Sequence, residues 1–90
     1  MPKKITKIVV AGAAGRMGRA ILQLAFRDPL VQIAGAFEQA AHPAIGRDVG
    51  ELIGQPPINV PIHPDIRECI KKANVIIDFT NPQAVSQNLE

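Results

Sequence analysis

Apolar positions alternate along the chain between short runs and helically spaced sets. The β-branched stretch from Ile5 to Ala11 predicts a buried strand. Over residues 16–27 the apolar side chains recur at helical spacing, which predicts an amphipathic helix with a face formed by Met17, Ile21, Leu24 and Ala25. Asp28-Pro29 ends this helix, because proline cannot continue the hydrogen-bond ladder. The apolar run from Leu30 to Phe37 predicts the second strand.

The pattern continues after a long interruption. Residues 39–57 are rich in Gly, Pro and Ala without a clean period, so we expect a long loop with room for one short helical turn. Ile58–Ile62 predicts a short strand, and the prolines in and around it place that strand at a sheet edge. Residues 65–73 predict a helix and Val75–Phe79 a buried strand. Asn81-Pro82 is typical of a helix start, so a third helix is expected to run toward Glu90.

Alternating strands and helices predict an α/β fold, here a partial Rossmann-like, doubly wound parallel sheet of about four strands and three helices. In such a sheet, Val75–Phe79 should lie beside the first strand, across the point where the strand order reverses. Ligands bind outside the carboxyl ends of the strands at that point.

A glycine-rich turn occupies this position, between the first strand and the first helix. It reads Gly12-Ala13-Ala14-Gly15-Arg16-Met17-Gly18, and its strand-turn-helix context is that of a dinucleotide fingerprint. Gly12 permits the sharp turn, Gly15 lets the backbone approach a pyrophosphate, and Gly18 lets the helix pack closely on the sheet. Amides at the helix N-terminus then hold the phosphates. No Lys-Ser/Thr follows the turn, which disfavours a P-loop NTPase.

Glu38 ends the second strand, twenty residues beyond Gly18. A carboxylate there can bind both hydroxyls of an adenosine ribose, although a lone strand-end carboxylate can also be merely solvated. Beside Glu38 and the neutral Gln39, a 2′-phosphate would need a cation such as Arg16 or Arg47. We therefore predict that NADH binds at least as tightly as NADPH.

Two residues are expected on the far side of the crevice. Thr80 offers a hydroxyl to the cofactor, and the helix that follows it offers free amides. Phe79 either lines the cofactor cleft or fills the core.

Composition narrows the class of protein. Apolar residues make up 47% of the chain, which is typical of a globular domain, and the net charge is only +2. With three Phe and no Trp or Tyr, stacking platforms for nucleic acid are lacking, so no nucleic-acid partner is expected. No apolar run approaches the ~20 residues of a membrane span, and no secretory signal is visible. We expect a cytoplasmic protein without membrane association.

The remaining reactive side chains do not form a catalytic arrangement. Cys69, the single cysteine, is expected as a buried small hydrophobe. His42 and His63 lack metal-ligand spacing, so no metal is expected. Asp48 and Glu51 are expected as solvated or helix-capping groups.

Four segments together resemble the 4-hydroxy-tetrahydrodipicolinate (dihydrodipicolinate) reductase family of lysine and diaminopimelate biosynthesis. They are Val10-Ala-Gly-Ala-Ala-Gly-Arg-Met-Gly-Arg19, Gly35-Ala-Phe-Glu38, Gly46-Arg-Asp-Val-Gly-Glu-Leu-Ile-Gly54 and Ile77-Asp-Phe-Thr-Asn-Pro82. The resemblance implies an NAD(P)H-dependent oxidoreductase that reduces a small cyclic dicarboxylate. It implies that Gly12–Gly18 hold the pyrophosphate with Arg16 and Met17 along the cofactor, that Glu38 holds the ribose, and that Phe79 and Thr80 lie toward the nicotinamide.

Departures from the family matter as well. Gln39 and Asn81 stand where many members have arginine, and both changes disfavour strong NADPH binding. The family's Gly-Thr-Thr-Gly segment, His-His pair and catalytic lysine have no counterpart here, so no catalytic residue is assigned in this chain. Residues 1–90 are expected to be the N-terminal part of a dinucleotide-binding domain, inactive alone, from an enzyme that is a homo-oligomer, typically a tetramer. Val75–Phe79 would then be an exposed apolar edge prone to self-association.

Two other classes stay open on the residues alone. Short-chain-type oxidoreductases and epimerases also use the G-x-x-G-x-x-G spacing. A non-catalytic nucleotide-sensing module would need only the binding turn.

Overall fold

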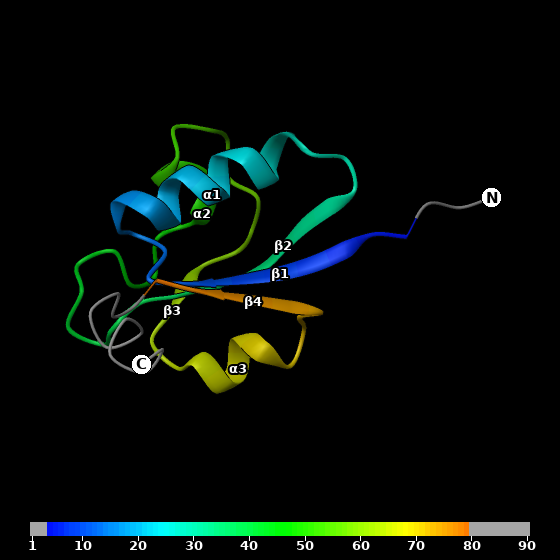
Figure 1. Cartoon of the computed structure of the whole chain (residues 1–90). Coiled ribbons are helices and arrows are strands. Elements are labelled where there is room, and N and C mark those ends of the chain that lie inside the picture. Colours follow the sequence, from blue (N-terminus) through cyan, green and yellow to red (C-terminus); the bar gives the residue numbers. More distant parts are fainter. Residues whose placement is uncertain (1–3, 80–90) are drawn as a thin grey trace, which may run out of the picture.

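The computed structural model describes residues 4–79. They form a four-stranded sheet in the order β3-β2-β1-β4, in which every neighbouring pair is parallel. The elements are β1 (Thr6–Ala11), α1 (Arg16–Arg27), β2 (Val31–Phe37), α2 (Val49–Leu52), β3 (Ile62–His63), α3 (Ile66–Ile70) and β4 (Val75–Asp78). α1 and α2 lie on one side of the sheet and α3 on the other (Figure 1). The predicted Rossmann-like α/β fold is confirmed; the helix predicted from Asn81 lies outside the described residues.

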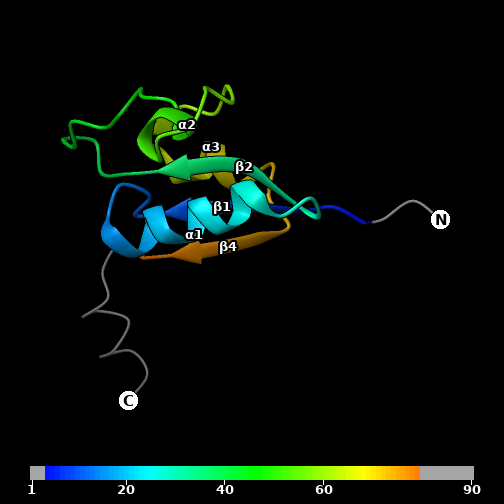
Figure 2. The ribbon, with the colours of Figure 1, turned by 90° about the horizontal axis from the view of Figure 1, so that it is seen from above.

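β1 is the central strand, flanked by β2 and β4 (Figure 2). Its last four residues, Ile8 to Ala11, are at most 5% exposed, as expected of a strand covered on both faces. Ala11 is in register with Phe37 of β2 and with Asp78 of β4, so three strands end at the same edge of the sheet. The strand order reverses between β1 and β4, as predicted.

α1 begins and ends where the sequence predicted, but only part of the predicted face is buried. Met17 and Leu24 are 61% and 66% exposed, whereas the buried residues are Gly18, Leu22 and Ala25. Gly18 sets this orientation, because a side chain at this position would collide with the backbone of the glycine turn. Residues spaced four and seven positions beyond it, Leu22 and Ala25, share its side of the helix. The predicted face was therefore wrong for Met17 and Leu24, whereas Ala25 is buried as predicted and Ile21 is partly buried against the core.

The third strand is shorter than predicted. β3 lies at the sheet edge, as expected, but it comprises only Ile62–His63. The preceding residues do not join the sheet because the backbone N–H groups of Ile58 and Val60 donate to the carboxylate of Asp48, at 2.8 Å each. Between them Asn59 has a positive φ of 62°, which breaks the extended conformation.

The loop over residues 39–57 contains one short helix, α2, and so matches the prediction. α3 is shorter than the predicted helix over 65–73: Asp65 caps it, and after Ile70 the chain continues as a turn. Cys69 on α3 is buried, as predicted, and its thiol contacts the carbonyl oxygen of Ala36 at 3.4 Å. Of the helices between residues 4 and 79, none has the length and apolar character that crossing a bilayer requires.

Candidate dinucleotide-binding site

The glycine turn is anchored to the end of β2. The amides of Gly12 and Ala13 both donate to the carbonyl oxygen of Phe37, at 2.9 and 3.2 Å. Gly12 has a φ of 80°, a conformation that glycine adopts without strain. The predicted role of Gly12 in a sharp turn off the strand is confirmed.

Gly18 is required by close packing. A Cβ at this position would lie 2.9 Å from both Cα and O of Ala13, closer than real Cβ atoms come. The neighbour is the backbone of the turn at the end of β1 rather than the face of the sheet. At Gly15, a Cβ would come 3.3 Å from the carbonyl oxygen of Gly12, which is tight, and Gly15 is otherwise exposed.

The N-terminus of α1 carries no side-chain cap. Its N-cap residue is Gly15, and the first turn contains no acidic residue. The first amides of a helix have no partner within the helix, and its dipole makes this end positive. Arg16 and Met17 are both exposed at this end. This helix end therefore combines unused donors with positive charge, which suits an anion.

Glu38 is buried beside the turn, with 8% of its surface exposed. Its Oε2 accepts a hydrogen bond from the amide of Ala14 at 2.8 Å, and its Oε1 accepts one from the amide of Gln39 at 3.3 Å. The interpretation as a merely solvated carboxylate is therefore wrong. Each carboxylate oxygen has a second lone pair that can accept a further hydrogen bond.

The far side of the crevice is described only as far as Phe79. The amide of Phe79 donates to the carbonyl oxygen of Ala11 at 2.7 Å, and its ring is partly buried against the hydrophobic core. Phe79 thus packs in part against the core, and its predicted place beside the cofactor stays a prediction. Thr80 lies outside the described residues, so its predicted contact with the cofactor stays a prediction.

A hollow of about 290 Å³ opens beside the glycine turn. We call it the turn hollow; its lining includes Ala14, Arg19, His42, Pro43, Ala44 and Arg47. The Nε of Arg19 donates to the carbonyl oxygen of Ala14 at 2.9 Å, and Nδ1 of His42 accepts from the amide of Ala44 at 3.0 Å. Of the two cations predicted from the sequence for a 2′-phosphate, Arg47 lines this hollow and Arg16 does not. The sequence-based prediction did not include Arg19, although the position of Arg19 one turn after Gly15 was a usable signal.

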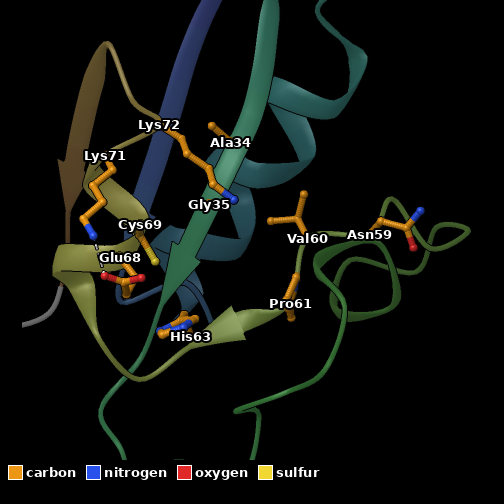
Figure 3. Close-up of a pocket in the computed structure, with 10 residues that line it drawn as sticks. All are labelled: Ala34, Gly35, Asn59, Val60, Pro61, His63, Glu68, Cys69, Lys71 and Lys72. Atoms are coloured by element: carbon orange, nitrogen blue, oxygen red, sulfur yellow. Dashed lines mark hydrogen bonds and ion pairs between the residues drawn. The ribbon is translucent and has the colours of Figure 1, made fainter.

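A second hollow of about 240 Å³ lies between α3, β2 and the chain around β3 (Figure 3). Its lining includes Gly35, His63, Cys69 and Lys72, and none of the residues of the glycine turn. Burial raises the pKa of the Cys69 thiol, which keeps it protonated and unreactive. We assign no chemistry to this hollow.

Asp48 organises the loop that forms one wall of the turn hollow. Its carboxylate accepts hydrogen bonds from the amides of Gly50, Ile58 and Val60 at 2.7 to 2.8 Å, which confirms a capping role. Burial raises the pKa of Asp48, but these backbone hydrogen bonds outweigh it and hold the pKa below its usual value. Glu51 is exposed. Within residues 4–79, no three His, Cys, Asp or Glu side chains gather in a way that could hold a metal ion.

Comparison with known families decides between the open classes. The family described as "Dihydrodipicolinate reductase, N-terminus" matches residues 6–90. The chain belongs to this family. The match confirms the resemblance seen in the sequence and disfavours both the short-chain alternative and the sensing module.

Individual relatives support the same family assignment. The 4-hydroxy-tetrahydrodipicolinate reductase of Anaeromyxobacter dehalogenans (strain 2CP-C) is 45% identical over 80 residues, which is 89% of this chain and 30% of the relative. That of Halorhodospira halophila is 42% identical over 77 residues, 86% of this chain and 29% of the relative. That of Geobacter sulfurreducens is 41% identical over 86 residues, 96% of this chain and 32% of the relative. The chain spans less than a third of each of these relatives.

Proposed function

We propose that this chain is the cofactor-binding part of an NAD(P)H-dependent 4-hydroxy-tetrahydrodipicolinate reductase. The family match supports the activity. The structural observation that most supports cofactor binding is the carboxylate of Glu38, which lies 2.8 Å from the amide of Ala14 and beside a helix N-terminus without a side-chain cap. When bound, the cofactor would supply a hydride to a small cyclic dicarboxylate.

The residues of the site fit a dinucleotide in two places. The turn from Gly12 to Gly18, including Ala13, Ala14, Arg16 and Met17, would hold the pyrophosphate through backbone amides and the α1 dipole. Glu38 would accept hydrogen bonds from the ribose hydroxyls with the lone pairs that Ala14 and Gln39 leave free.

The nicotinamide end is assigned by family resemblance to Phe79 and Thr80. The proposal gives all these residues binding and orienting roles, and it places no catalytic residue among them. The complete protein is proposed to work as a homo-oligomer, a tetramer by family resemblance, in the cytoplasm.

We further propose that NADH binds at least as tightly as NADPH. A 2′-phosphate placed near Glu38 meets a negative carboxylate, and Gln39 brings no compensating charge. The supporting geometry is the burial of Glu38 at the end of β2, which gives its carboxylate little freedom to move away.

Titration of the chain with NADH and with NADPH, followed by nicotinamide fluorescence, tests both parts. We expect saturable binding of both, with NADH at least as tight. Binding of neither nucleotide would overturn the cofactor site, and clearly tighter binding of NADPH would overturn the preference alone.

A further inference from the structure

The turn hollow holds three potential donors that the proposed cofactor contacts above do not use. We propose that this hollow takes the 2′-phosphate of NADPH and that Arg47 is the residue on which NADPH affinity depends. The inference rests on the proposed dinucleotide site and adds a specificity-determining residue to it.

The turn hollow lies next to the proposed ribose site. Ala14 is shared between the turn hollow and the proposed ribose site: its amide donates to Glu38 and its carbonyl accepts from Nε of Arg19. The hollow therefore opens beside the same residue that the ribose-binding carboxylate contacts.

Two arginine side chains that line the turn hollow can bind an anion. Neither Arg19 nor Arg47 forms an ion pair with another residue in the range 4–79. Arg19 commits one guanidinium N–H to Ala14 and keeps its terminal N–H groups free for an anion. Two unpaired guanidinium groups provide the forked donors that match a phosphate.

His42 adds a third donor. Its Nδ1 accepts a hydrogen bond from the amide of Ala44, so the ring proton lies on Nε2. Nε2 can therefore donate to a phosphate oxygen in the hollow.

The backbone of Arg47 is held in place from two sides. Its amide donates to the carbonyl oxygen of Ala44 at 3.0 Å, and its carbonyl accepts from the amide of Ile62 in β3 at 2.9 Å. The Arg47 side chain thus starts from an anchored point, which lowers the ordering cost of binding. With about 290 Å³, the hollow is at the lower end of small-molecule sites and fits a phosphate group rather than a whole nucleotide.

The arginines of the turn hollow could supply the positive charge that Glu38 and Gln39 do not provide for a 2′-phosphate. Neither residue can compensate the charge of a 2′-phosphate, so any favourable contribution of that phosphate to NADPH affinity must come from cations elsewhere near the ribose. Arg16 belongs to the turn proposed to hold the pyrophosphate and does not line the hollow, and Arg19 is partly committed to that turn. Arg47 is therefore the cation whose loss should affect NADPH without disturbing the pyrophosphate cradle.

The test compares R47Q with a matched control, R27Q. Arg27 is an exposed arginine in the last turn of α1, at the end of the helix away from the glycine turn, so R27Q removes the same charge without touching the hollow. Affinities for NADH, NADPH and adenosine 2′,5′-bisphosphate are measured for each variant and for the unaltered chain, with circular dichroism as the check on folding. We expect R47Q to weaken NADPH and the bisphosphate by about tenfold, and R27Q to weaken them by less than about twofold.

NADH affinity distinguishes the proposed role of Arg47 from the proposed cofactor site. NADH affinity should stay within about twofold in R47Q, since NADH has no 2′-phosphate. If folded R47Q loses affinity for NADH and NADPH equally, or loses no affinity for NADPH, the proposed role of Arg47 is wrong. NADH binding by the unaltered chain would still support the cofactor site in either case. If the unaltered chain binds neither nucleotide, the proposed function itself fails.

Two further measurements keep the inference testable if R47Q does not fold. R47K keeps the charge but not the fork, and it should lose part of the NADPH affinity. In the unaltered chain, added salt should weaken NADPH more steeply than NADH. The same salt dependence for both nucleotides would count against a cationic 2′-phosphate site.

Discussion

Glu38 shows how a single side chain can serve the fold and a ligand together. Its carboxylate joins the end of β2 to the glycine turn through the amide of Ala14, which is itself only 6% exposed. Without this acceptor, the amide would be buried and unpaired. The residue proposed to recognise the ribose is therefore also the residue that holds the phosphate-binding turn against β2.

Two substitutions of Glu38 separate these tasks. Glu38→Ala removes the acceptor for the Ala14 amide, so we expect the free energy of unfolding to fall by about 1–3 kcal/mol. Glu38→Gln keeps a carbonyl acceptor and should retain most of this stability, but loss of the charge should weaken NADH by about tenfold. Urea denaturation and NADH titration measure the two effects. Equal destabilisation by both variants, or unchanged NADH affinity in Glu38→Gln, would contradict this division of roles.

The sequence was sufficient to predict the residues of the turn, but of the polar residues in the turn hollow it indicated only Arg47. Gly12 and Gly18 are recognisable because their roles depend on local backbone geometry next to a strand and a helix. Arg19, His42 and Arg47 come together only after α1 and the loop before α2 have packed, and no spacing rule connects them. Long-range side-chain clusters of this kind become visible only in the structure.

At the scale of the element, α1 illustrates what periodicity can and cannot predict. Spacing located the helix from Arg16 to Arg27 correctly, because the proline after Asp28 and the glycine before Arg16 delimit it. Hydrophobicity favoured a face that included Met17 and Leu24, since Gly18 contributes no apolar side chain. The observed face is set instead by a backbone contact that only glycine permits, and hydrophobicity does not register such a contact.

The loop between β2 and β3 was predicted as irregular, and its order depends on Asp48. Its carboxylate accepts hydrogen bonds from the amide of Gly50 in the first turn of α2 and from the amides of Ile58 and Val60 beyond it. This arrangement also explains why residues 58–61 are absent from β3. The sequence contained Asp48 as a candidate cap, but the reach to Ile58 and Val60 depends on the loop's tertiary path.

Asp48→Ala should destabilise the protein in a pH-dependent way. The pKa of Asp48 is lower in the folded protein than in the unfolded chain, so its contribution is complete above the unfolded pKa of about 4 and is lost as the pH falls through the lower folded value. At neutral pH we expect a loss of about 1–3 kcal/mol in the free energy of unfolding. Urea denaturation at neutral pH and at successively lower pH measures it.

Glu51→Ala, an exposed carboxylate on the same helix, is the control for Asp48→Ala. The two variants should differ at neutral pH and converge as the medium becomes strongly acidic. A stability difference that grows with acidification would have the wrong sign and would contradict the capping role.

The two edges of the sheet differ at the scale of the whole molecule. β3 is short and has prolines on either side, Pro61 and Pro64, which discourages pairing with another strand. β4 lies at the other end of the strand order, and its Val75 and Ile76 are 44% and 47% exposed. The predicted apolar edge is therefore present in the described part of the chain.

We expect this edge to cause self-association of the chain at high concentration. Ile76→Lys should reduce the associated fraction, because a charge on an edge strand opposes pairing. Leu24→Lys on the exposed face of α1 places the same charge on an equally apolar surface without an open strand. Sedimentation velocity compares the three proteins. A stable monomer at high concentration, or equal effects of the two lysines, would argue against edge pairing.

The hydrogen bond between Ala14 and Glu38 has a consequence for the order of events during synthesis. It spans 24 residues, and both partners belong to the first strand-helix-strand unit. The glycine turn also takes its anchor from Phe37 in that unit. A growing polypeptide thus acquires the turn and its acidic partner before β4 has been translated. Since a ligand stabilises the state that binds it, nucleotide bound at that moment would stabilise the folded form of this first strand-helix-strand unit.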